Sequence, residues 1–385
     1  GMSSLGFQVV YDLLNRDDRV VAERVFYPDK PETSLPPEGG KGLLSMESLS
    51  PLSRFDLVAF SLSFENDDLH VLRVLDWARI PVLREERDDA HPFVLGGGIR
   101  AMLNPEPLAP FFDAFLLGEA EAVLQRFVSR FRESTTAGRT GRESARGLAP
   151  EFPSLYVPSL YRPRYRPDGT LEILEPLERG VPERIRPART AGAGAPAVST
   201  ITTPETEFGE KVLVELGRGC GRACRFCAAG HVYRPPRFHP ESELKACVDG
   251  ALSITPRLGL LSPAVSDTPG IEALTARIVE RGGTFSVSSL RADSLGPKLL
   301  EQLARAGQKS IAVAPEAGTE RLRRVINKHL TEEEILEAVG RIASVQAFSL
   351  RLYFMIGLPT ETREDITGIV ELTKRIRHRM VRESG

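Results

Sequence analysis

Three cysteines lie within eight residues of one another, in the segment Cys220-Gly-Arg-Ala-Cys224-Arg-Phe-Cys227. Thiols spaced this closely can all face inward only if the backbone wraps around one compact group. A structural zinc ion normally takes four protein ligands, whereas a 4Fe–4S cluster held by three thiolates keeps one iron without a protein ligand. Because that iron is an open coordination position, the segment predicts an iron–sulfur cluster that takes part in chemistry.

Two other arrangements of these cysteines are open. They could form one disulfide and one free thiol, or a zinc site completed by His231 or His239. A disulfide is disfavoured because the chain has only four cysteines and no resemblance to a secretion signal at its start. Zinc is disfavoured because no second CxxC pair and no spaced histidine pair follow. The fourth cysteine, Cys247, lies in an apolar helical pattern and is predicted to pack as a small hydrophobe.

The CxxxCxxC spacing, with Phe226 directly before the last cysteine, resembles the signature of the radical SAM superfamily. The resemblance implies that Cys220, Cys224 and Cys227 bind three irons of a 4Fe–4S cluster and that S-adenosylmethionine chelates the fourth. It also implies reductive cleavage of S-adenosylmethionine to a 5′-deoxyadenosyl radical, with Phe226 beside the adenine. In such enzymes the cofactors supply the chemistry, and the protein supplies binding and orientation.

The resemblance implies an electron donor and a substrate, and two alternative functions are open. A flavodoxin- or ferredoxin-like electron donor is expected, and RNA or a protein is the expected substrate class. One alternative is a cobalamin-dependent radical SAM methyltransferase. Another, from a different class, is a non-catalytic iron–sulfur electron carrier or a degenerate scaffold.

Strand and helix patterns alternate from residue 206 to the end of the chain. Apolar runs of strand length cover residues 211–216, 258–261, 284–288, 310–314 and 349–356. Helical patterns follow them at 240–254, 270–281, 294–306, 331–344 and 361–377. Five β/α units with the cysteines after the first strand predict a partial TIM-type barrel, in which ligands bind at the carboxyl ends of the strands.

Further candidate ligands follow the later strands. The resemblance implies that Glu316 accepts hydrogen bonds from the ribose of S-adenosylmethionine and that Ile356 packs on its adenine. Residues 288–291 follow the third strand and could place Arg291 near the methionyl carboxylate, and Ser288 of this segment is a further candidate ligand of the cofactor. An alternative interpretation makes Glu316 a helix N-cap or a surface carboxylate.

One expected segment departs from the family pattern. The Gly-Gly-Glu type segment after the second strand is replaced by residues 261–267, so backbone groups around Ser262 are predicted to take its place beside the amino group. Arginines also surround the cysteines, at positions 218, 222, 225, 234 and 237. They could offset the negative charge of a thiolate-bound cluster or attract an anionic substrate.

Residues 1–131 form a second α/β series. The predicted elements are a helix at 7–15, strands at 19–26 and 55–61, a helix at 66–80, strands at 92–95 and 114–117, and a helix to 131. Repeated β-loop-α units predict a Rossmann-like parallel sheet. The segments 61–63, 96–98 and 113–121 resemble the cobalamin-binding-like domain that precedes the barrel in one branch of the superfamily.

Cobalamin itself is predicted to be absent or to bind without a histidine ligand, because no histidine precedes His70. The resemblance also implies that the chain begins after the first strand of this domain and stops before the sixth barrel strand. Another chain could supply the missing strands.

Between the two series, residues 132–205 are predicted to be a loop, a hairpin and a linker. Residues 132–146 lack periodicity and predict a mobile loop, whereas Asp168-Gly169 between two strand-like runs predicts a hairpin. The chain has 385 residues, a net charge of −2 and no apolar run long enough to span a bilayer. Length and charge favour a multidomain protein with no overall attraction to nucleic acid or membranes. The few cysteines and the oxygen-labile cluster motif indicate the cytoplasm.

Overall fold

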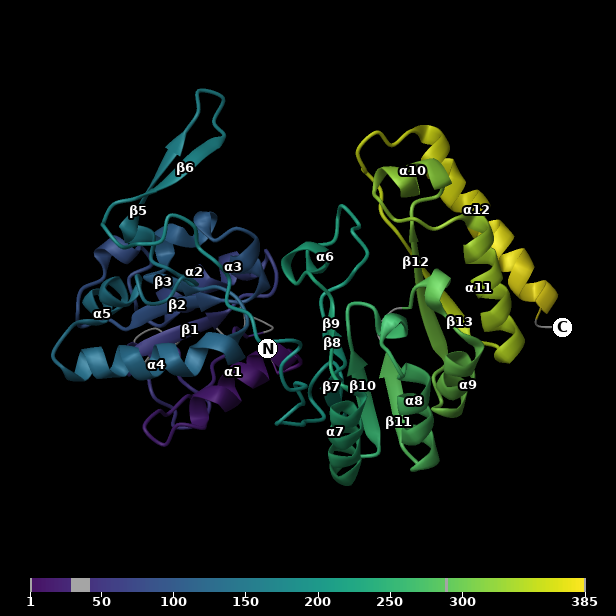
Figure 1. Cartoon of the computed structure of the whole chain (residues 1–385), viewed down its shortest axis with the longest axis horizontal. Coiled ribbons are helices and arrows are strands. Elements are labelled where there is room, and N and C mark those ends of the chain that lie inside the picture. Colours follow the sequence, from purple (N-terminus) through teal and green to yellow (C-terminus); the bar gives the residue numbers. More distant parts are fainter. Residues whose placement is uncertain (1, 29–41, 288–289, 384–385) are drawn as a thin grey trace. The chain divides into compact units, whose positions relative to one another are not determined.

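A computed structural model describes residues 2–28, 42–287 and 290–383 of the chain. The chain divides into two compact units, Gly1–Ala191 and Gly192–Gly385, each with its own apolar core (Figure 1). Parallel strands alternate with helices in both units, so the predicted α/β fold class is confirmed. Within the described residues, no helix is long and apolar enough to cross a membrane.

The first unit is built on a four-stranded sheet in the order β1-β2-β3-β4. Its strands are β1 (Leu57–Ser61), β2 (Phe93–Gly97), β3 (Ala114–Leu116) and β4 (Leu155–Tyr156), of which only the last runs antiparallel to its neighbour. Its helices are α1 (Leu5–Asn15), α2 (Asp67–Trp77), α3 (Ile99–Leu103), α4 (Ala120–Thr136) and α5 (Gly141–Leu148). Short 3₁₀ turns lie at Leu52–Arg54, Arg84–Glu86, Glu106–Phe111 and Pro158–Leu160.

An aromatic core holds this sheet to its helices. Phe112, Phe115 and Phe127 are fully buried, and the rings of Phe112 and Phe115 lie 4.7 Å apart. Large buried aromatic side chains contribute much of the apolar area that stabilises a domain of this size. Strand β2 is buried on both faces, which explains why it reads as a continuous apolar run.

The prediction of a strand at residues 19–26 is wrong. Residues 20–28 form no strand, although they are rich in valine and aromatic side chains. The backbone of Arg24 instead bonds to a turn, with Met46 N–H donating to Arg24 O at 2.9 Å and Arg24 N–H donating to Glu47 Oε2 at 2.7 Å. A β-branched run becomes a strand only where a neighbouring strand completes its ladder of hydrogen bonds.

The prediction of a mobile loop at 132–146 is also wrong. Helix α4 continues to Thr136, and α5 begins at Gly141. Thr140 and Glu143 form a capping box in which each side chain accepts a hydrogen bond from the other residue's backbone N–H. This Thr-x-x-Glu pattern is a sequence signal for a helix start, and it outweighs the weak periodicity of a short polar helix.

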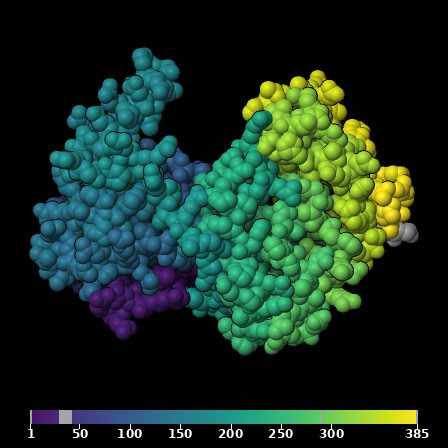
Figure 2. Space-filling view, in the orientation of Figure 1, coloured from purple at the N-terminus to yellow at the C-terminus, as the bar shows by residue number. Residues whose placement is uncertain are grey.

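The predicted hairpin is confirmed. Strands β5 (Tyr161–Tyr165) and β6 (Leu171–Pro176) pair antiparallel, and Gly169 in their turn has a φ of +83°. Only the base of the hairpin is buried, and its tip stands out from the surface of the first unit (Figure 2).

The second unit contains all five predicted parallel strands. They are β7 (Val212–Glu215), β10 (Arg257–Leu261), β11 (Thr284–Val287), β12 (Ser310–Glu316) and β13 (Ser349–Phe354). The strands pair in the order β7-β10-β11, β12 pairs with β13, and a parallel bridge from Leu290 to Val313 joins the two sets. Two short strands, β8 (Gly217–Arg218) and β9 (Arg237–Phe238), pair antiparallel beside them.

Helices follow these strands, as the sequence predicted. They are α6 (Ala229–Val232), α7 (Glu241–Ile254), α8 (Ile271–Glu280), α9 (Pro297–Arg305), α10 (Glu320–Val325), α11 (Glu332–Val345) and α12 (Arg363–Glu383), with 3₁₀ turns at Val265–Asp267 and Ala292–Ser294. Their apolar faces pack on fully buried strand residues such as Val212, Leu258 and Ile311. The carboxyl ends of the parallel strands therefore share one edge, where barrel ligands bind.

Candidate functional site

The three clustered cysteines lie in one loop at the carboxyl end of β7. The antiparallel pair β8–β9 brings Gly217 opposite Phe238 and so closes residues 219–236 into a loop. Gly219 at its entrance has a φ of +77°, and a Cβ atom there would lie 2.1 Å from the carbonyl oxygen of Tyr233. Only glycine fits both the backbone angle and this close approach.

All three cysteines are free thiols. Cys220 and Cys224 are buried, and Cys227 is half-buried. Arg222 N–H donates to Cys220 Sγ at 3.4 Å, and Cys227 N–H donates to the carbonyl of Cys224 at 3.2 Å. Burial raises the pKa of the Cys224 thiol, and the charges of Lys328 and Arg291 act in the opposite direction. Among the residues that the structure describes, no three His, Cys, Asp or Glu side chains form a group that could hold a single metal ion.

The two histidines considered as zinc ligands bind other groups. His231 Nε2 lies 3.1 Å from the carbonyl oxygen of Cys224, on the backbone of the loop itself. His239 is buried, with Nδ1 at 3.1 Å from the carbonyl oxygen of Gly194 and Nε2 at 3.4 Å from Glu215 Oε2. His231 therefore supports the loop, and His239 joins Gly194 to Glu215 at the end of β7.

A network of charges joins the cysteine loop to the ends of the next two strands. Arg222 pairs with Asp267 after β10, at 3.1 Å, and with Asp293 after β11, at 2.9 Å. Burial would raise the pKa of Asp293, but the hydrogen bond from Arg291 and the charge of Arg222 hold it below its ordinary value. The structure thus places Arg291 beside Asp293, at 2.9 Å, within this network.

Two of the arginines around the cysteines pair with carboxylates, and two others donate to backbone carbonyls. Arg218 pairs with Glu215 at 2.9 Å, and Arg222 is taken up by two aspartates. Arg225 Nη1 donates to the carbonyl of Val325, and Arg237 Nη1 donates to the carbonyl of Gly192 at 2.8 Å. The charge of Arg218 and Arg222 serves mainly to hold the loop on its neighbours.

A second support comes from the residues that follow α10. Arg225 N–H donates to the carbonyl of Ile326 at 3.0 Å, and Asn327 Nδ2 donates to the carbonyl of Ala223 at 2.6 Å. Asn327 has a φ of +56°, a left-handed angle that asparagine tolerates better than most residues. The middle of the cysteine loop is thus fixed to residues 325–327.

Glu316 ends strand β12 at an irregularity in its pairing with β13 and has a φ of +68°. Its Oε1 accepts a hydrogen bond from Lys328 Nζ at 2.9 Å, and both side chains are largely buried. The N-cap of α10 is Thr319, whose side chain accepts from Leu322 N–H at 3.3 Å. The alternative that Glu316 is a helix cap or a surface carboxylate is therefore wrong.

The remaining predicted ligands that the structure describes differ in exposure and in hydrogen bonding. Phe226 and Ile356 are exposed apolar side chains, with 40% and 75% of their surface accessible. Ser262 Oγ accepts from Ala264 N–H at 3.2 Å within its own turn. Ser288 lies outside the described residues.

The sequence analysis missed Asp267, Asp293, Asn327 and Lys328. The two aspartates follow predicted strands and could have been matched to the arginines of the loop by charge. Asn327 and Lys328 carry no local signal, because their partners lie elsewhere in the sequence.

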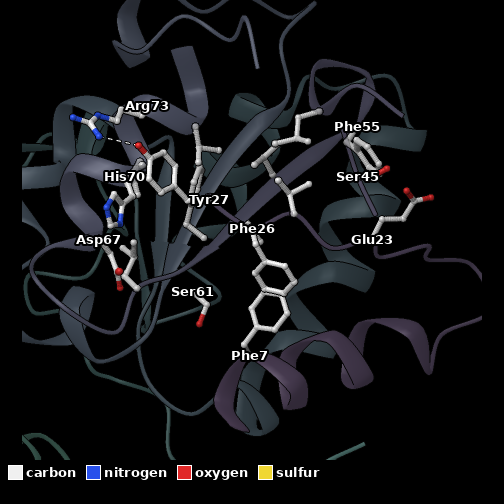
Figure 3. A pocket seen from close by; sticks show the side chains of 18 of the residues that line it. Phe7, Glu23, Phe26, Tyr27, Ser45, Phe55, Ser61, Asp67, His70 and Arg73 are labelled. Atoms are coloured by element: carbon white, nitrogen blue, oxygen red, sulfur yellow. Dashed lines mark hydrogen bonds between the residues drawn. The ribbon is translucent and has the colours of Figure 1, made fainter. Parts of the chain in front are cut away.

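The first unit has a cavity of about 630 Å³ lined in part by β1, the edge strand of the described sheet (Figure 3). At one end Tyr27 stacks on His70, with ring centres 4.4 Å apart, and accepts a hydrogen bond from Arg73 at 2.8 Å. Glu23, Ser45 and Phe55 lie at the other end (Figure 3).

The segments of the first unit that resemble a cobalamin-binding-like domain contact each other. Gly98 has a φ of +103°, and a Cβ atom there would lie 2.3 Å from the carbonyl oxygen of Leu62. Leu62 N–H donates to the carbonyl of Gly97 at 2.8 Å. The triple glycine therefore fits tightly against the residues that follow β1.

Family models match both units. Residues 6–158 match the model of radical SAM proteins, N-terminal, and residues 214–373 match that of the radical SAM superfamily. The protein MJ0966 of Methanocaldococcus jannaschii is 30% identical over 340 residues, which cover 87% of this chain and 66% of that protein.

Two solved structures share the fold at 14% sequence identity. The cobalamin-dependent S-adenosylmethionine radical enzyme OxsB, with aqua-cobalamin and S-adenosylmethionine bound, matches with a TM-score of 0.60 over 96% of this chain and 49% of that chain. The radical S-adenosylmethionine methyltransferase TsrM from Kitasatospora setae, with cobalamin and a [4Fe–4S] cluster bound, matches with a TM-score of 0.59 over 96% of this chain and 70% of its own. The chain thus spans about half of OxsB.

Proposed function

Because the chain belongs to the radical SAM superfamily, we propose that it is an enzyme that holds a 4Fe–4S cluster on Cys220, Cys224 and Cys227 and cleaves S-adenosylmethionine reductively. The family uses these two cofactors. When bound and reduced, the cluster supplies the electron that splits the sulfonium and yields a 5′-deoxyadenosyl radical. The residues of this chain hold the cofactors, orient them and keep competing reactions away.

The chemistry of the donor set fits this cluster. The loop offers three thiols and no carboxylate near them in sequence, and thiolates are the usual protein ligands of iron–sulfur clusters. Arg222 N–H already donates to the sulfur of Cys220, the kind of contact that tunes a cluster. The proposal rests above all on three free cysteines gathered in one closed loop at the carboxyl end of β7.

The strand ends beside the loop would bind S-adenosylmethionine. Glu316 is proposed to accept from the ribose, while the exposed side chains of Phe226 and Ile356 offer apolar surface to the adenine. Arg291 and Ser288 are proposed to address the methionyl carboxylate. Backbone groups near Ser262 are proposed to take the amino group.

A reductive reaction needs an external electron source, so we propose a flavodoxin- or ferredoxin-like donor. RNA or a protein is the proposed substrate class. An oxygen-sensitive cluster also favours the cytoplasm as the place where the protein works.

Anaerobic reconstitution with iron and sulfide tests the proposal. About four irons per chain are expected after desalting, followed by release of 5′-deoxyadenosine when S-adenosylmethionine and a chemical reductant are added. Iron without 5′-deoxyadenosine would indicate an electron carrier or a degenerate scaffold. A zinc-loaded protein without bound iron would overturn the proposal.

A cobalamin-dependent methyl transfer is the second candidate. It is favoured by the fold shared with OxsB and TsrM over 96% of this chain. Transfer of a labelled methyl group from S-adenosylmethionine to added cobalamin, kept as cobalt(I) by the chemical reductant, would separate this activity from cleavage alone.

A further inference from the structure

The first unit has a smaller cavity at the amino ends of β2 and β3. Phe93, the first residue of β2, and Asp113, directly before β3, both line it, so it lies at the opposite ends of these strands from the triple glycine. Its volume is about 240 Å³, which suits a ligand smaller than those of most binding pockets. Its charged and hydroxyl side chains are three arginines, two carboxylates and one serine, namely Arg84, Arg87, Arg142, Glu85, Asp113 and Ser159.

The three arginines bring positive charges close together. Burial lowers the pKa of Arg87, the charge of Asp113 raises it, and the charges of Arg142 and Arg84 lower it further. The guanidiniums therefore lie near enough to repel one another. Such a group of cations is costly unless enough negative charge lies among them.

Asp113 supplies part of this negative charge, and both of its oxygens are already bonded. Oδ1 accepts from Arg142 Nε at 3.0 Å, while Oδ2 accepts from a backbone N–H of β2 at 2.8 Å and lies 3.4 Å from Arg87 Nη2. The second carboxylate, Glu85, is exposed and forms no ion pair in the part of the chain that the structure describes. Arg84 is thus left without a carboxylate partner among the described residues.

Two buried N–H donors at this cavity lack an acceptor. Arg84 Nη1 and Arg87 Nε are both inaccessible to solvent, and neither donates a hydrogen bond to a described residue. The other nitrogens of Arg87 donate to the carbonyls of Pro81, at 3.1 Å, and Phe111, at 2.9 Å, so its guanidinium is held in place. Because a buried donor of a charged group is costly without an acceptor, we expect a ligand with acceptor oxygens here.

The donors differ in their origin, which favours one kind of anion. They come from two arginines, and the hydroxyl of the exposed Ser159 adds a third group at the cavity wall. A carboxylate has two oxygens and matches the fork of one guanidinium. A phosphate group presents three oxygens and a charge of about −1.5 to −2, so it can accept from several donors at once. Arginine forks are the usual protein groups for such recognition.

We propose that this cavity is a binding site for a phosphate group, supplied by inorganic phosphate or by a small phosphate monoester. Arg84 and Arg87 donate to its oxygens, and Ser159 donates from the wall. Arg142, which Asp113 holds in place, adds positive charge beside them. The inference goes beyond the proposed function and shares no residue with it.

Equilibrium dialysis of labelled inorganic phosphate against the full chain, at constant ionic strength, tests the site. The parent should take up one phosphate per chain. Arg84→Met should weaken binding about tenfold, because a charged donor is lost, and Ser159→Ala should weaken it about threefold. Both variants should fold, since Arg84 forms no hydrogen bond with a described residue and Ser159 is exposed. Arg164→Met, at an exposed arginine of β5, is the matched control and should bind phosphate as the parent does.

Competition identifies the source of the phosphate group. Displacement of the label by glycerol 3-phosphate would support a monoester ligand, and retention of the label would support inorganic phosphate itself. Acetate at the same concentration should not displace the label. Equal displacement by acetate would overturn the assignment of the site to phosphate.

Unfolding in urea gives a second measurement that does not depend on dialysis. Phosphate should raise the urea midpoint of the parent, followed by the fluorescence of Trp77, and should raise that of Arg84→Met much less. A parent that takes up no phosphate would overturn the proposal, as would Arg84→Met binding as the parent does or Arg164→Met losing as much. Water would then satisfy the buried donors. None of these results changes the expected iron content or 5′-deoxyadenosine release, so the proposed function is tested separately.

Discussion

The two units place loops at the carboxyl ends of parallel strands, yet the contacts of these loops differ. In the second unit the cysteine loop bonds to side chains from three other segments, through Asp267, Asp293 and Asn327. In the first unit the loop after β1 meets the triple glycine through backbone, with Leu62 N–H on the carbonyl of Gly97. A parallel sheet creates the same place in both units. In the first unit it holds the ion pair of Arg100 with Asp68, at 2.6 Å, whereas in the second unit it holds ion pairs and three thiols.

This difference shows what each glycine-rich turn requires. At Gly219 the tight approach to Tyr233 closes a loop that carries three thiols. At Gly98 the tight approach is to Leu62, the residue directly after β1 of the same unit. The same residue type therefore positions a candidate site in one unit and packs the fold in the other.

The largest effect is expected from the cysteines. Replacing any one of Cys220, Cys224 or Cys227 with Ala should abolish retention of about four irons per chain, because the cluster loses one of its three thiolates. Iron and acid-labile sulfide, measured after anaerobic reconstitution and desalting, check this result. Cys247→Ala is the control and should keep its iron, because Cys247 only packs against the core. Loss of iron from the Cys247 variant would contradict the assignment of the cluster to three cysteines of one loop, because the site would then extend beyond that loop.

Gly98→Ala should give the next largest effect, on stability. The added Cβ would combine a φ of +103° with a 2.3 Å clash against the carbonyl of Leu62, so a loss on the order of 2–4 kcal/mol is expected. Urea unfolding followed by fluorescence checks it, because Trp77 in α2 is the one tryptophan and reports on the first unit. Gly138→Ala is the matched control, with a φ of +89° and no atom near the new Cβ, and should cost about 1 kcal/mol. Equal losses of unfolding free energy in the two variants would mean that the close contact with Leu62 does not require glycine at position 98.

The fold could be predicted from the sequence where apolar runs have the length of a buried strand. Strands β7 and β10 of the second unit were found this way, because residues buried on both faces leave a continuous apolar run. The prediction failed at residues 19–26, where strand-like residues form no strand. A strand depends on its partner, and the composition of one segment does not contain that partner.

The candidate site was predictable only in part. The cysteines are close in sequence and so give a local pattern. Asn327 and its acceptor Ala223 are separated by 104 positions, and the Arg222–Asp267 pair by 45. Such pairs form only after the strand ends have been brought together, so no local pattern contains them.

A smaller effect is expected at the proposed nucleotide ligands. Glu316→Ala should weaken S-adenosylmethionine binding by about 1.5–3 kcal/mol, because a charged acceptor of the ribose hydroxyls is lost. Ile356→Ala should cost less, since it removes only apolar contact. Equilibrium dialysis under anaerobic conditions checks both values, and iron content should stay unchanged. If Glu316→Ala binds S-adenosylmethionine as well as the parent does, Glu316 does not contact the ribose. The end of β12 would then serve only the packing of the fold, as Gly98 does in the first unit.

The smallest effect is expected when hydroxocobalamin is added to the protein. No histidine precedes His70, and the His70 ring stacks on Tyr27 with ring centres 4.4 Å apart, within the cavity beside β1. Because the stacked His70 ring is already packed against Tyr27, we expect that it does not bind cobalt. The corrin should therefore either not bind or bind without a histidine ligand. The absorption spectrum of the desalted protein, and the nitrogen splitting in the electron paramagnetic resonance spectrum of the cobalt(II) form, measure this directly. His70→Ala should give the same spectra as the parent. Stoichiometric uptake with a histidine-ligated signal that disappears in His70→Ala would reverse the comparison, because the first unit would then hold a metal centre of its own.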